Sequence, residues 1–344
     1  MLMVIFGAGA SYDSVEAVRP NVGTARDYQD RPPLADELFQ DRPRFTEMMT
    51  RYRDCVPLIS RLRTREGGLS VEEMLGRLWD AAPTYGARYR QFAAIRFYLH
   101  AMMWVCQLRW RDTSRGITNH VTLLDLIDQW LPRYERVCLV TFNYDLLIEH
   151  ALDYKRIAIV SLSDYVSHPA YKLIKAHGSI NWGREVRSPV IDPAKGPLEA
   201  AFEMIERSEE LEFADEFVWT GEHDMGRLSN EGILVFPALA IPLIAKAQFE
   251  CPKAHESVLR DSIPLVSKIL VIGWRGAERH FLELLSGLSG SKKIPGLVVA
   301  GDRGRASEVI VGLSRASDRI TWSASDGGFS DFVTSGEADR FLSA

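Results

Sequence analysis

Short runs of β-branched and aliphatic residues recur along the chain, and most of them end abruptly at Gly, Thr, His or Pro. Segments with helical periodicity separate these runs. Strands that are buried on both faces have continuous apolar runs, and parallel strands need a helical crossover between them. The alternation therefore predicts an α/β fold with a Rossmann-like, doubly wound parallel sheet. The expected strands are Leu2–Phe6, Val137–Thr141, Ala158–Val160, Lys172–Ala176, Gly232–Phe236, Ile269–Ile272, Leu297–Ala300 and Arg319–Trp322.

Two long stretches interrupt this alternation. Residues 7–136 separate the first two expected strands, and we interpret residues 30–132 as a helical insertion. Residues 183–230 form a second insertion, in which a run of Glu and Asp fits a solvated helix face. No repeat or flexible linker separates independent units, so we predict that residues 1–344 form a single domain with two insertions. The expected helices of the first insertion are Leu34–Phe39, Val71–Trp79, Ala87–Arg111 and Val121–Leu131.

Charge and cysteine content exclude several classes of protein. The 344 residues carry 41 Lys and Arg against 46 Asp and Glu, a formal net charge of -5, so we expect no direct nucleic-acid binding. The apolar N-terminus lacks a basic region, and no apolar stretch reaches the roughly 20 residues that span a bilayer, so we expect a cytoplasmic protein with no membrane partner. The cysteines are not spaced for a zinc site or a disulfide framework: Cys55, Cys106, Cys138 and Cys251.

A glycine-rich turn, Gly7-Ala8-Gly9-Ala10-Ser11, follows the first expected strand directly. Glycines at such a bend let the backbone approach a ligand, and the N–H groups of a helix start can bind a pyrophosphate. As a dehydrogenase fingerprint the turn is incomplete, because Tyr12 stands in place of the third glycine and no acidic residue ends a second strand about 20 residues later. By itself, the motif is equally compatible with a tight strand-to-loop turn.

Two further motifs follow later strands. The run from Thr141 to Asp145 (Thr-Phe-Asn-Tyr-Asp) ends the second strand, where Asn143 and Asp145 would project toward a ligand, although Asp145 could equally cap the following helix. His177-Gly178-Ser179 ends a third strand, and a histidine can exchange a proton near neutral pH, although a lone histidine is more often structural. Because ligands of doubly wound sheets bind at the carboxyl ends of strands, we expect the three motifs to converge on one crevice.

Together, the three motifs resemble the core of the Sir2 (sirtuin) superfamily, and their spacing resembles its bacterial Sir2-like branch of antiphage-defence NAD hydrolases. That branch has a Pro-Pro-Leu-x-x-x-Leu-Phe segment after the first turn, which residues 32–39 match. It also has a late strand that ends in Ile-Gly, as Ile272-Gly273 does here. The resemblance extends from residue 4 to about residue 302.

The resemblance implies that NAD binds as the substrate and that no metal is needed. It implies that Gly7, Gly9 and Ser11 cradle the pyrophosphate, and that Asn143 and Asp145 lie by the nicotinamide ribose. His177 would be the general base. The remaining expected cofactor-binding positions are Ala8 and Thr141 beside these motifs, Gly178 after the histidine, Gly273 and Arg275 near the phosphates, and Gly301 near the adenosine.

The departures from the family decide between its activities. Sirtuin deacylases carry a zinc module with paired CxxC spacing and a Gln before the catalytic Asn, whereas these cysteines are scattered and Phe142 replaces the Gln. The resemblance therefore implies an NAD+ glycohydrolase in antiphage defence, with protein deacylation less expected. A sensor that binds NAD or ADP-ribose without turnover, and an interaction subunit, stay open as alternatives. Because unregulated hydrolysis would be toxic, we expect control by homo-oligomerisation or by a separate activating partner such as an ATPase.

Overall fold

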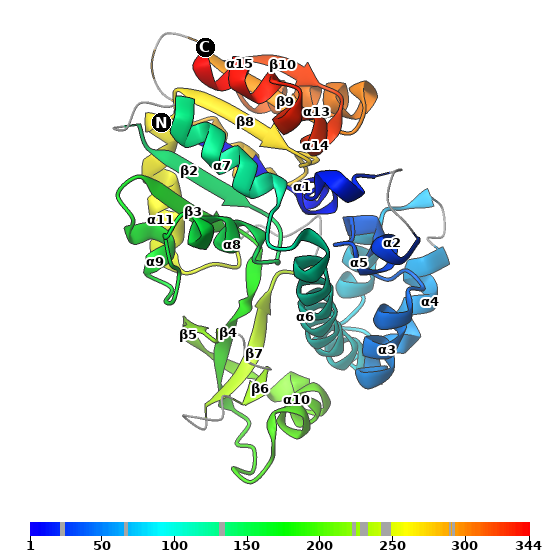
Figure 1. Cartoon of the computed structure of the whole chain (residues 1–344). Coiled ribbons are helices and arrows are strands. Elements are labelled where there is room, and N and C mark those ends of the chain that lie inside the picture. The colour runs from blue at the N-terminus through cyan, green and yellow to red at the C-terminus, as the bar shows by residue number, and fades with distance from the viewer. Residues whose placement is uncertain are drawn as a thin grey trace. The chain divides into compact units, whose positions relative to one another are not determined.

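The computed structural model describes residues 1–20, 25–64, 68–130, 135–221, 225–227, 233–241, 249–288, 290 and 293–344 (Figure 1). The chain divides into two compact units. The core unit comprises Met1–Pro32, Arg109–His177 and Ala247–Ala344, and the insert unit comprises Pro33–Leu108 and Gly178–Lys246. The insert unit overlaps the two predicted insertions, but residues 109–132 of the first one belong to the core unit. The organisation as a single domain with two insertions stays a prediction.

The core unit contains a six-stranded sheet in which every neighbouring pair is parallel. Its strand order is β10-β9-β8-β1-β2-β3, which is the 3-2-1-4-5-6 order of Rossmann sheets when these six strands are renumbered along the chain. This topology confirms the predicted fold class. The strands are β1 (Leu2–Phe6), β2 (Val137–Thr141), β3 (Tyr171–Lys175), β8 (Lys268–Ile272), β9 (Ile294–Val299) and β10 (Ile320–Ser325).

Helices cover both faces of this sheet. One face buries alternate strand residues such as Ile5 and Val140 against apolar side chains of α11 (Lys253–Ser262), α12 (Arg279–Leu285) and α13 (Arg303–Ala316). On the other face, Phe6 contacts α7 (Asn119–Trp130) and α14 (Gly328–Thr334), and Figure 1 shows α7 lying over the strands. The other helical segments of the core unit are α1 (Ala8–Tyr12), η1 (Glu16–Val18), α2 (Ala25–Asp30), α7 (Asn119–Trp130), α8 (Leu147–Tyr154), α9 (Asp164–Ser167), η6 (Ile263–Leu265), α14 (Gly328–Thr334) and α15 (Glu337–Ser343).

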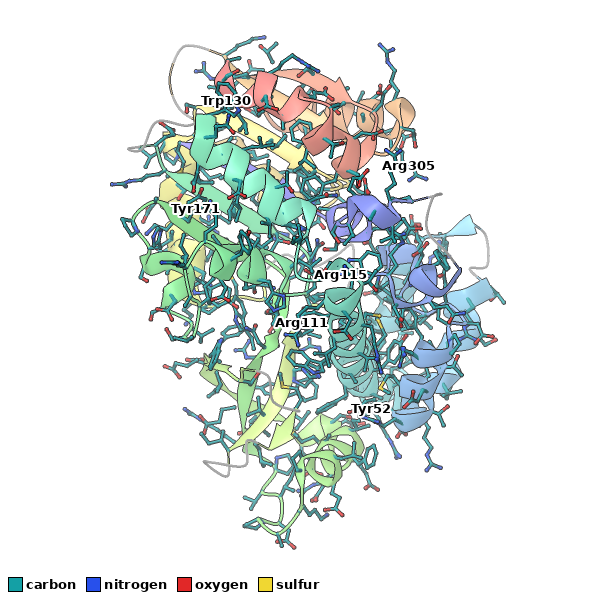
Figure 2. The ribbon with its side chains drawn as sticks, viewed as in Figure 1. Tyr52, Arg111, Arg115, Trp130, Tyr171 and Arg305 are labelled. Carbon is teal, nitrogen blue, oxygen red and sulfur yellow. The ribbon has the colours of Figure 1, made fainter. Side chains whose placement is uncertain are left out.

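The end of α7 is tied to its neighbours by two aromatic side chains that are labelled in Figure 2. Trp130 donates from its indole nitrogen to Asp339 of α15 at 2.6 Å. Tyr171, at the start of β3, donates its hydroxyl hydrogen to Asp128 of α7. Because these contacts join α7 to β3 and to the C-terminal helix, they fix the helix that leads into β2.

The insert unit combines helices with a four-stranded antiparallel sheet of order β5-β4-β7-β6. The helix α6 (Ala87–Ser114) belongs to this unit as far as Leu108. The other elements are η2 (Ala35–Glu37), α3 (Pro43–Arg51), η3 (Arg53–Cys55), α4 (Val56–Thr64), α5 (Val71–Asp80), β4 (Gly178–Ser188), α10 (Pro197–Glu206), η5 (Ser208–Glu210), β5 (Glu212–Trp219), β6 (Gly226–Arg227) and β7 (Leu234–Leu239).

Most of the expected local structure is confirmed, and two strand expectations are wrong. The expected strand Ala158–Val160 is irregular chain between α8 and α9, and Val160 is 65% exposed, so this run has no buried position to occupy. The expected strand Gly232–Phe236 corresponds to β7, which lies in the antiparallel sheet rather than the parallel one. Residue 232 lies outside the described residues.

Two helical expectations also need correction. The expected helix Leu34–Phe39 is a single 3-10 turn, η2, because Leu38 and Phe39 are buried in succession instead of at helical spacing. The acidic run is only partly helical: α10 carries its first residues, whereas Glu212, Asp215 and Glu216 are exposed positions of strand β5. Solvation of these carboxylates therefore does not depend on a helix. The expected helices at Val71–Trp79, Ala87–Arg111 and Val121–Leu131 correspond to α5, α6 and α7.

None of the helices within the described ranges is long and apolar enough to cross a membrane.

Candidate functional site

The strand order places a switch point between β1 and β8. From β1 the chain leads to β2 on one side, and from β8 it leads to β9 on the other. Ligands of doubly wound sheets bind at such a point, outside the carboxyl ends of the strands. The two loops that leave these strands are joined by hydrogen bonds, from Gly7 N to Ile272 O and from Gly9 N to Gly273 O, both 3.0 Å long.

The glycines of these two loops are required by their close approach. A Cβ on Gly7 would lie 2.5 Å from Cα of Trp274, and a Cβ on Gly9 would lie 2.8 Å from Cα of Gly273. Gly273 also has a φ of +61, and its Cβ would lie 2.4 Å from the backbone nitrogen of Ala10. Contact between the two loops is therefore one reason for these glycines, and their expected role at a pyrophosphate stays a prediction. Ala8 begins α1 and is half-buried.

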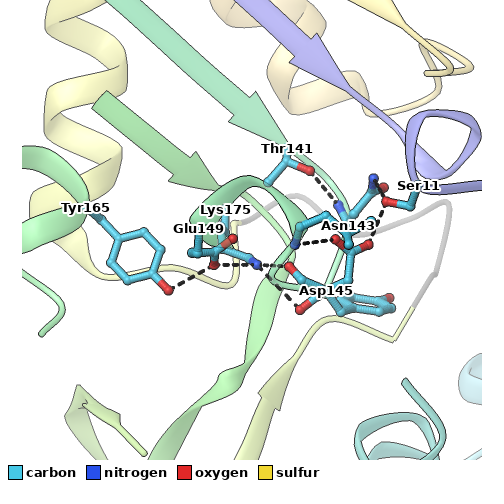
Figure 3. A network of polar contacts seen from close by, with 9 residues as sticks. Ser11, Thr141, Asn143, Asp145, Glu149, Tyr165 and Lys175 are labelled. Atoms are coloured by element: carbon cyan, nitrogen blue, oxygen red, sulfur yellow. Dashed lines mark hydrogen bonds and ion pairs between the residues drawn. The ribbon is translucent and has the colours of Figure 1, made fainter. Parts of the chain in front are cut away.

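Three of the predicted residues form one hydrogen-bonded cluster (Figure 3). The Asn143 amide donates from Nδ2 to Gly7 O at 2.9 Å and to Ser11 Oγ at 2.8 Å. Ser11 Oγ in turn donates to Oδ2 of Asp145 at 2.6 Å. The side chains are buried, with exposed fractions of 2% for Ser11, 9% for Asn143 and 5% for Asp145. The structure thus brings together residues from the loops after β1 and β2.

The loop after β2 is held from several sides. The backbone N–H of Asn143 donates to Thr141 Oγ1 at 3.1 Å, and the N–H of Phe142 donates to Phe6 O at 3.1 Å. Asp145 Oδ1 accepts from the N–H of Leu147 at 3.1 Å, at the beginning of α8. Asp145 therefore supports the helix start and joins the polar cluster at the same time, and its expected place beside a ligand stays a prediction.

His177 lies beside an aromatic cluster at the end of β3. Its half-buried ring contacts the ring of Phe142 edge-on, with centroids 5.0 Å apart. Phe142 stacks on Trp274 at 5.1 Å with an interplanar angle of 6°. Since Phe142 precedes Asn143 directly, this packing places the histidine loop next to the loop that carries the polar cluster.

The remaining predicted positions have different surroundings. Gly178 has a φ of +83, and its Cβ would lie 1.9 Å from Ala238 O, so the approach of β7 within the insert unit requires this glycine. Arg275 is exposed in the loop after β8. Gly301 is also exposed, and its Cβ would meet no described atom within 4 Å, so packing does not require a glycine there.

Sequence reasoning missed two ionisable residues close to this cluster. Lys175 is fully buried and contacts the loop between Asn143 and Leu147. His120, 2% exposed, lies between Phe6 and Phe329, with ring centroids 5.3 and 5.2 Å away. Burial lowers the pKa of His120 to about 4, against the opposing effect of the Asp145 charge. In the sequence, the one indication of a role for Lys175 was its charge at the end of a strand that is otherwise largely buried.

A second buried carboxylate lies at the other end of α1. Asp13 accepts hydrogen bonds from the backbone N–H of Ser330 at 3.0 Å and from its hydroxyl at 2.5 Å. Asn119 donates to the backbone carbonyl of Asp13 at 2.7 Å and to Ser330 Oγ at 2.9 Å. Burial raises the pKa of Asp13, although the hydrogen bonds from Ser330 oppose that shift. These contacts connect the first loop to the segment after β10.

Within the ranges that the structure describes, no group of three or more His, Cys, Asp or Glu side chains is arranged to hold a metal ion. A comparison with protein-family models finds no match, and neither does a comparison with curated proteins. Among solved structures, the chain is similar to one from "The Structural basis of Sirtuin Substrate Affinity". The two share 15% identity over 97% of this chain and 93% of the other, with a TM-score of 0.38.

The class of protein follows from the strand order and from the cluster at the switch point. The core unit is a Rossmann-like α/β structure with a candidate ligand site at the carboxyl ends of β1, β2 and β8.

Proposed function

We propose that this chain is a Sir2-like NAD+ glycohydrolase, which cleaves NAD+ to nicotinamide and ADP-ribose. The observation that carries the proposal is the buried hydrogen-bonded cluster of Ser11, Asn143 and Asp145 at the switch point of the sheet. These residues come from two of the three motifs on which the resemblance to sirtuins rests. A glycine-rich first turn in a sheet of this order is typical of dinucleotide-binding proteins.

In this proposal the dinucleotide lies along the carboxyl edge of the sheet. The turn from Gly7 to Ser11 borders its pyrophosphate, and Gly273 and Arg275 approach the phosphates from the loop after β8. Gly301 adjoins the adenosine. Ala8, Thr141 and Gly178 shape the backbone beside these residues, and the Thr141 hydroxyl also accepts from the N–H of Asn143. The exposure of Arg275 and Gly301 supports this assignment, because both are accessible to a ligand.

The proposed reaction breaks the bond between C1′ of the ribose and N1 of nicotinamide. The electron pair of that bond goes to the nicotinamide ring, which leaves as a neutral molecule, and positive charge develops on the ribose as in glycoside hydrolysis. The oxygen of a water molecule then bonds to C1′, and the water loses one proton. The products are nicotinamide, ADP-ribose and that proton, so no redox partner is required.

The protein's residues would supply orientation and a base. Hydrogen bonds from the Asn143 amide to Gly7 O and Ser11 Oγ fix which side of the amide carries its nitrogen. We propose that its oxygen accepts a hydrogen bond from the attacking water or from a ribose hydroxyl. Asp145 holds Ser11, and through it Asn143. His177 would accept the proton of the water, since the ordinary pKa of histidine lies near neutrality.

The test is to incubate the purified chain with NAD+ and to quantify nicotinamide and ADP-ribose by chromatography. We expect Asn143→Ala and His177→Ala to reduce turnover by about 100-fold or more. A matched control is His168→Ala, because His168 lies at the opposite end of β3, where its ring nitrogen accepts from the N–H of Tyr171 at 3.1 Å. Thermal unfolding of each variant checks that it is folded.

The outcomes separate the proposed enzyme from its alternatives. Turnover at the wild-type level in a folded Asn143 or His177 variant overturns the assignment. NAD+ binding without release of nicotinamide, in every assembly state that can be prepared, indicates an NAD or ADP-ribose sensor instead. Absence of both binding and release favours an interaction subunit.

Regulation by assembly extends the proposal. An NAD+ hydrolase in antiphage defence must be inactive until it is triggered, and we propose that homo-oligomerisation or an activating protein such as an ATPase provides this control in the cytoplasm. Light scattering coupled to size-exclusion chromatography, with activity measured across protein concentration, tests this point. A monomer that is fully active alone contradicts control by assembly.

A further inference from the structure

A buried ion pair lies beside the loop that carries Asn143 and Asp145 (Figure 3). Lys175 is the last residue of β3, and its side chain is 0% exposed. Its ammonium contacts Oε1 of Glu149 in α8 at 2.8 Å. Tyr165 donates its hydroxyl hydrogen to the same oxygen at 3.0 Å, so the carboxylate is held from two sides.

The ammonium also binds the loop itself. Lys175 Nζ donates to the backbone carbonyl of Asp145 and, at 3.4 Å, to that of Tyr144. A buried carbonyl group requires a donor, and two successive carbonyls are oriented here by one charged group. Asn143 therefore has its side chain fixed by Gly7 and Ser11 on one side, while the following peptide groups are fixed by Lys175 on the other.

Stability does not explain why a charged pair occupies this position. Removing two charges from water is costly, and apolar side chains of similar volume are often as stabilising as a buried ion pair. The hydrogen bonds to two loop carbonyls, in contrast, need a donor that reaches from β3 to the loop after β2. Lysine reaches that point, and Glu149 supplies the opposite charge.

We propose that Lys175 and Glu149 are a positioning pair that sets the backbone from Tyr144 to Asp145 and thereby aligns Asn143 for the reaction. The proposal rests on the proposed function, because the alignment is measured through NAD+ cleavage. Neither residue is assigned contact with NAD+. Loss of the pair should therefore lower kcat while leaving KM nearly unchanged, because the loops after β1 and β8 that border the dinucleotide are intact.

The experiment compares three variants of the full chain: Lys175→Met, Glu149→Gln, and the double variant Lys175→Met with Glu149→Leu. We expect Lys175→Met to lower kcat by about 100-fold, as small misplacements of a reacting group do, with KM within about threefold of the wild type. The double variant contains no unpaired buried charge, so it should regain part of the thermal stability that Lys175→Met loses, but it lacks the donor to the two loop carbonyls and should keep the low kcat.

Lys172→Met is the matched control. Lys172 lies on the same strand and donates to the backbone carbonyl of Val166 at 2.6 Å, so it makes the same kind of bond at a distance from the loop. Its loss should leave kcat unchanged. Wild-type kcat in the double variant would overturn the proposal, because the pair would then matter for stability alone. Equal losses of kcat in Lys175→Met and Lys172→Met would also overturn it.

Hydrogen–deuterium exchange separates this proposal from the proposed function. If the wild-type chain releases no nicotinamide, the proposed function fails, and the loop can still be observed directly. The double variant should exchange faster than the wild type in peptides covering residues 142–149, whereas Lys172→Met should not. Unchanged exchange in the double variant overturns the positioning role whatever the activity.

Discussion

The two halves of the parallel sheet end in different kinds of residue. β1 and β2 lead to Ser11, Asn143 and Asp145, whose side chains bond one another. β8 and β9 lead instead to the glycines at 273 and 301. The first half therefore supplies the oriented polar groups as well as the close-packed Gly7 and Gly9, whereas the second supplies glycine backbone without such a polar cluster. In the proposed enzyme, such a site would separate the groups that do chemistry from the surfaces that admit the dinucleotide.

The largest loss of stability is expected at Gly273, in the half of the sheet formed by β8 and β9. In Gly273→Ala, the new Cβ would lie 2.4 Å from Ala10 N at a φ of +61. Left-handed backbone costs an alanine about 1–2 kcal/mol, and overpacking adds about 1–3 kcal/mol, so we expect a loss of about 2–5 kcal/mol in the free energy of unfolding. Urea unfolding followed by circular dichroism measures the loss.

Gly276→Ala is the matched control for this substitution. Gly276 is in the same loop with a φ of +69, but its Cβ would meet only Val309 Cγ1, at an ordinary 3.8 Å. We expect a loss of about 1–2 kcal/mol from the backbone alone. Equal losses at positions 273 and 276 would mean that close approach does not distinguish the two glycines.

A loss of stability of similar size is expected from the protonation of His120, which is buried beside Phe6. Its folded pKa of about 4 lies below the ordinary 6.5, so between these values the unfolded chain binds more protons than the folded chain. Stability should therefore fall as pH is lowered from 6.5 to 4, by roughly 3 kcal/mol from this residue. His120→Phe should lose that part of the pH dependence, as unfolding at pH 8 and at pH 5 would reveal.

His255 contributes to the same window and remains in both proteins. Burial lowers the pKa of His255, which likewise favours unfolding on acidification. The free energy of unfolding should therefore depend less steeply on pH in His120→Phe than in the wild type, but the dependence should not vanish. An identical slope in both proteins would show that His120 is protonated in the folded state at the same pH as in the unfolded chain.

Ser11→Ala tests the cluster of Ser11, Asn143 and Asp145 by removing a single hydroxyl. It removes the donor to Asp145 and the acceptor of Asn143, and an unsatisfied buried group costs about 1–3 kcal/mol, so we expect a loss of about 2–3 kcal/mol together with reduced NAD+ turnover. Ser14→Ala, which loses one acceptor for Trp110 Nε1 at 2.8 Å, should cost about 1 kcal/mol and leave turnover unchanged. Equal losses of stability and of turnover in the two variants would mean that Ser11 has no special role.

The smallest effect is expected at Gly301. Because a Cβ there meets no described atom within 4 Å, Gly301→Leu should leave stability unchanged. If the adenosine lies against this glycine, KM for NAD+ should rise about tenfold, which corresponds to about 1.4 kcal/mol. Gly312→Leu, at an equally open glycine of α13, is the control. An unchanged KM in Gly301→Leu would mean that Gly301 does not lie against the adenosine.

Prediction from sequence succeeded where local pattern and burial agree. β1 and β2 have the predicted bounds because both are buried at every position and end at a turn. The prediction of a strand at Ala158–Val160 was wrong because three apolar residues resemble a strand whether or not a partner strand exists. β7 was recognised as a strand but joined a different sheet, since pairing depends on neighbours that are distant in the sequence.

The candidate site was predictable only in part for the same reason. The residues that follow each strand can be read directly, which is why Ser11, Asn143, Asp145 and His177 were candidates. Lys175 was not a candidate, because its role depends on how far its side chain reaches from β3 to a neighbouring loop. The glycines at 7 and 273 were recognised as special, but their contact with each other's loop was not.

The sequence by itself determined the strands of the parallel sheet and which polar residues or glycines follow them, because apolar runs and turn residues are local features of a sequence. Only the tertiary structure decided that β8 lies beside β1, which creates the switch point and makes the loops after Phe6 and Ile272 adjacent. It also joined Asn143 to Ser11 and Lys175 to Glu149. Such contacts arise from strand order and from the need of each buried polar group for a partner, and neither is encoded in a local pattern.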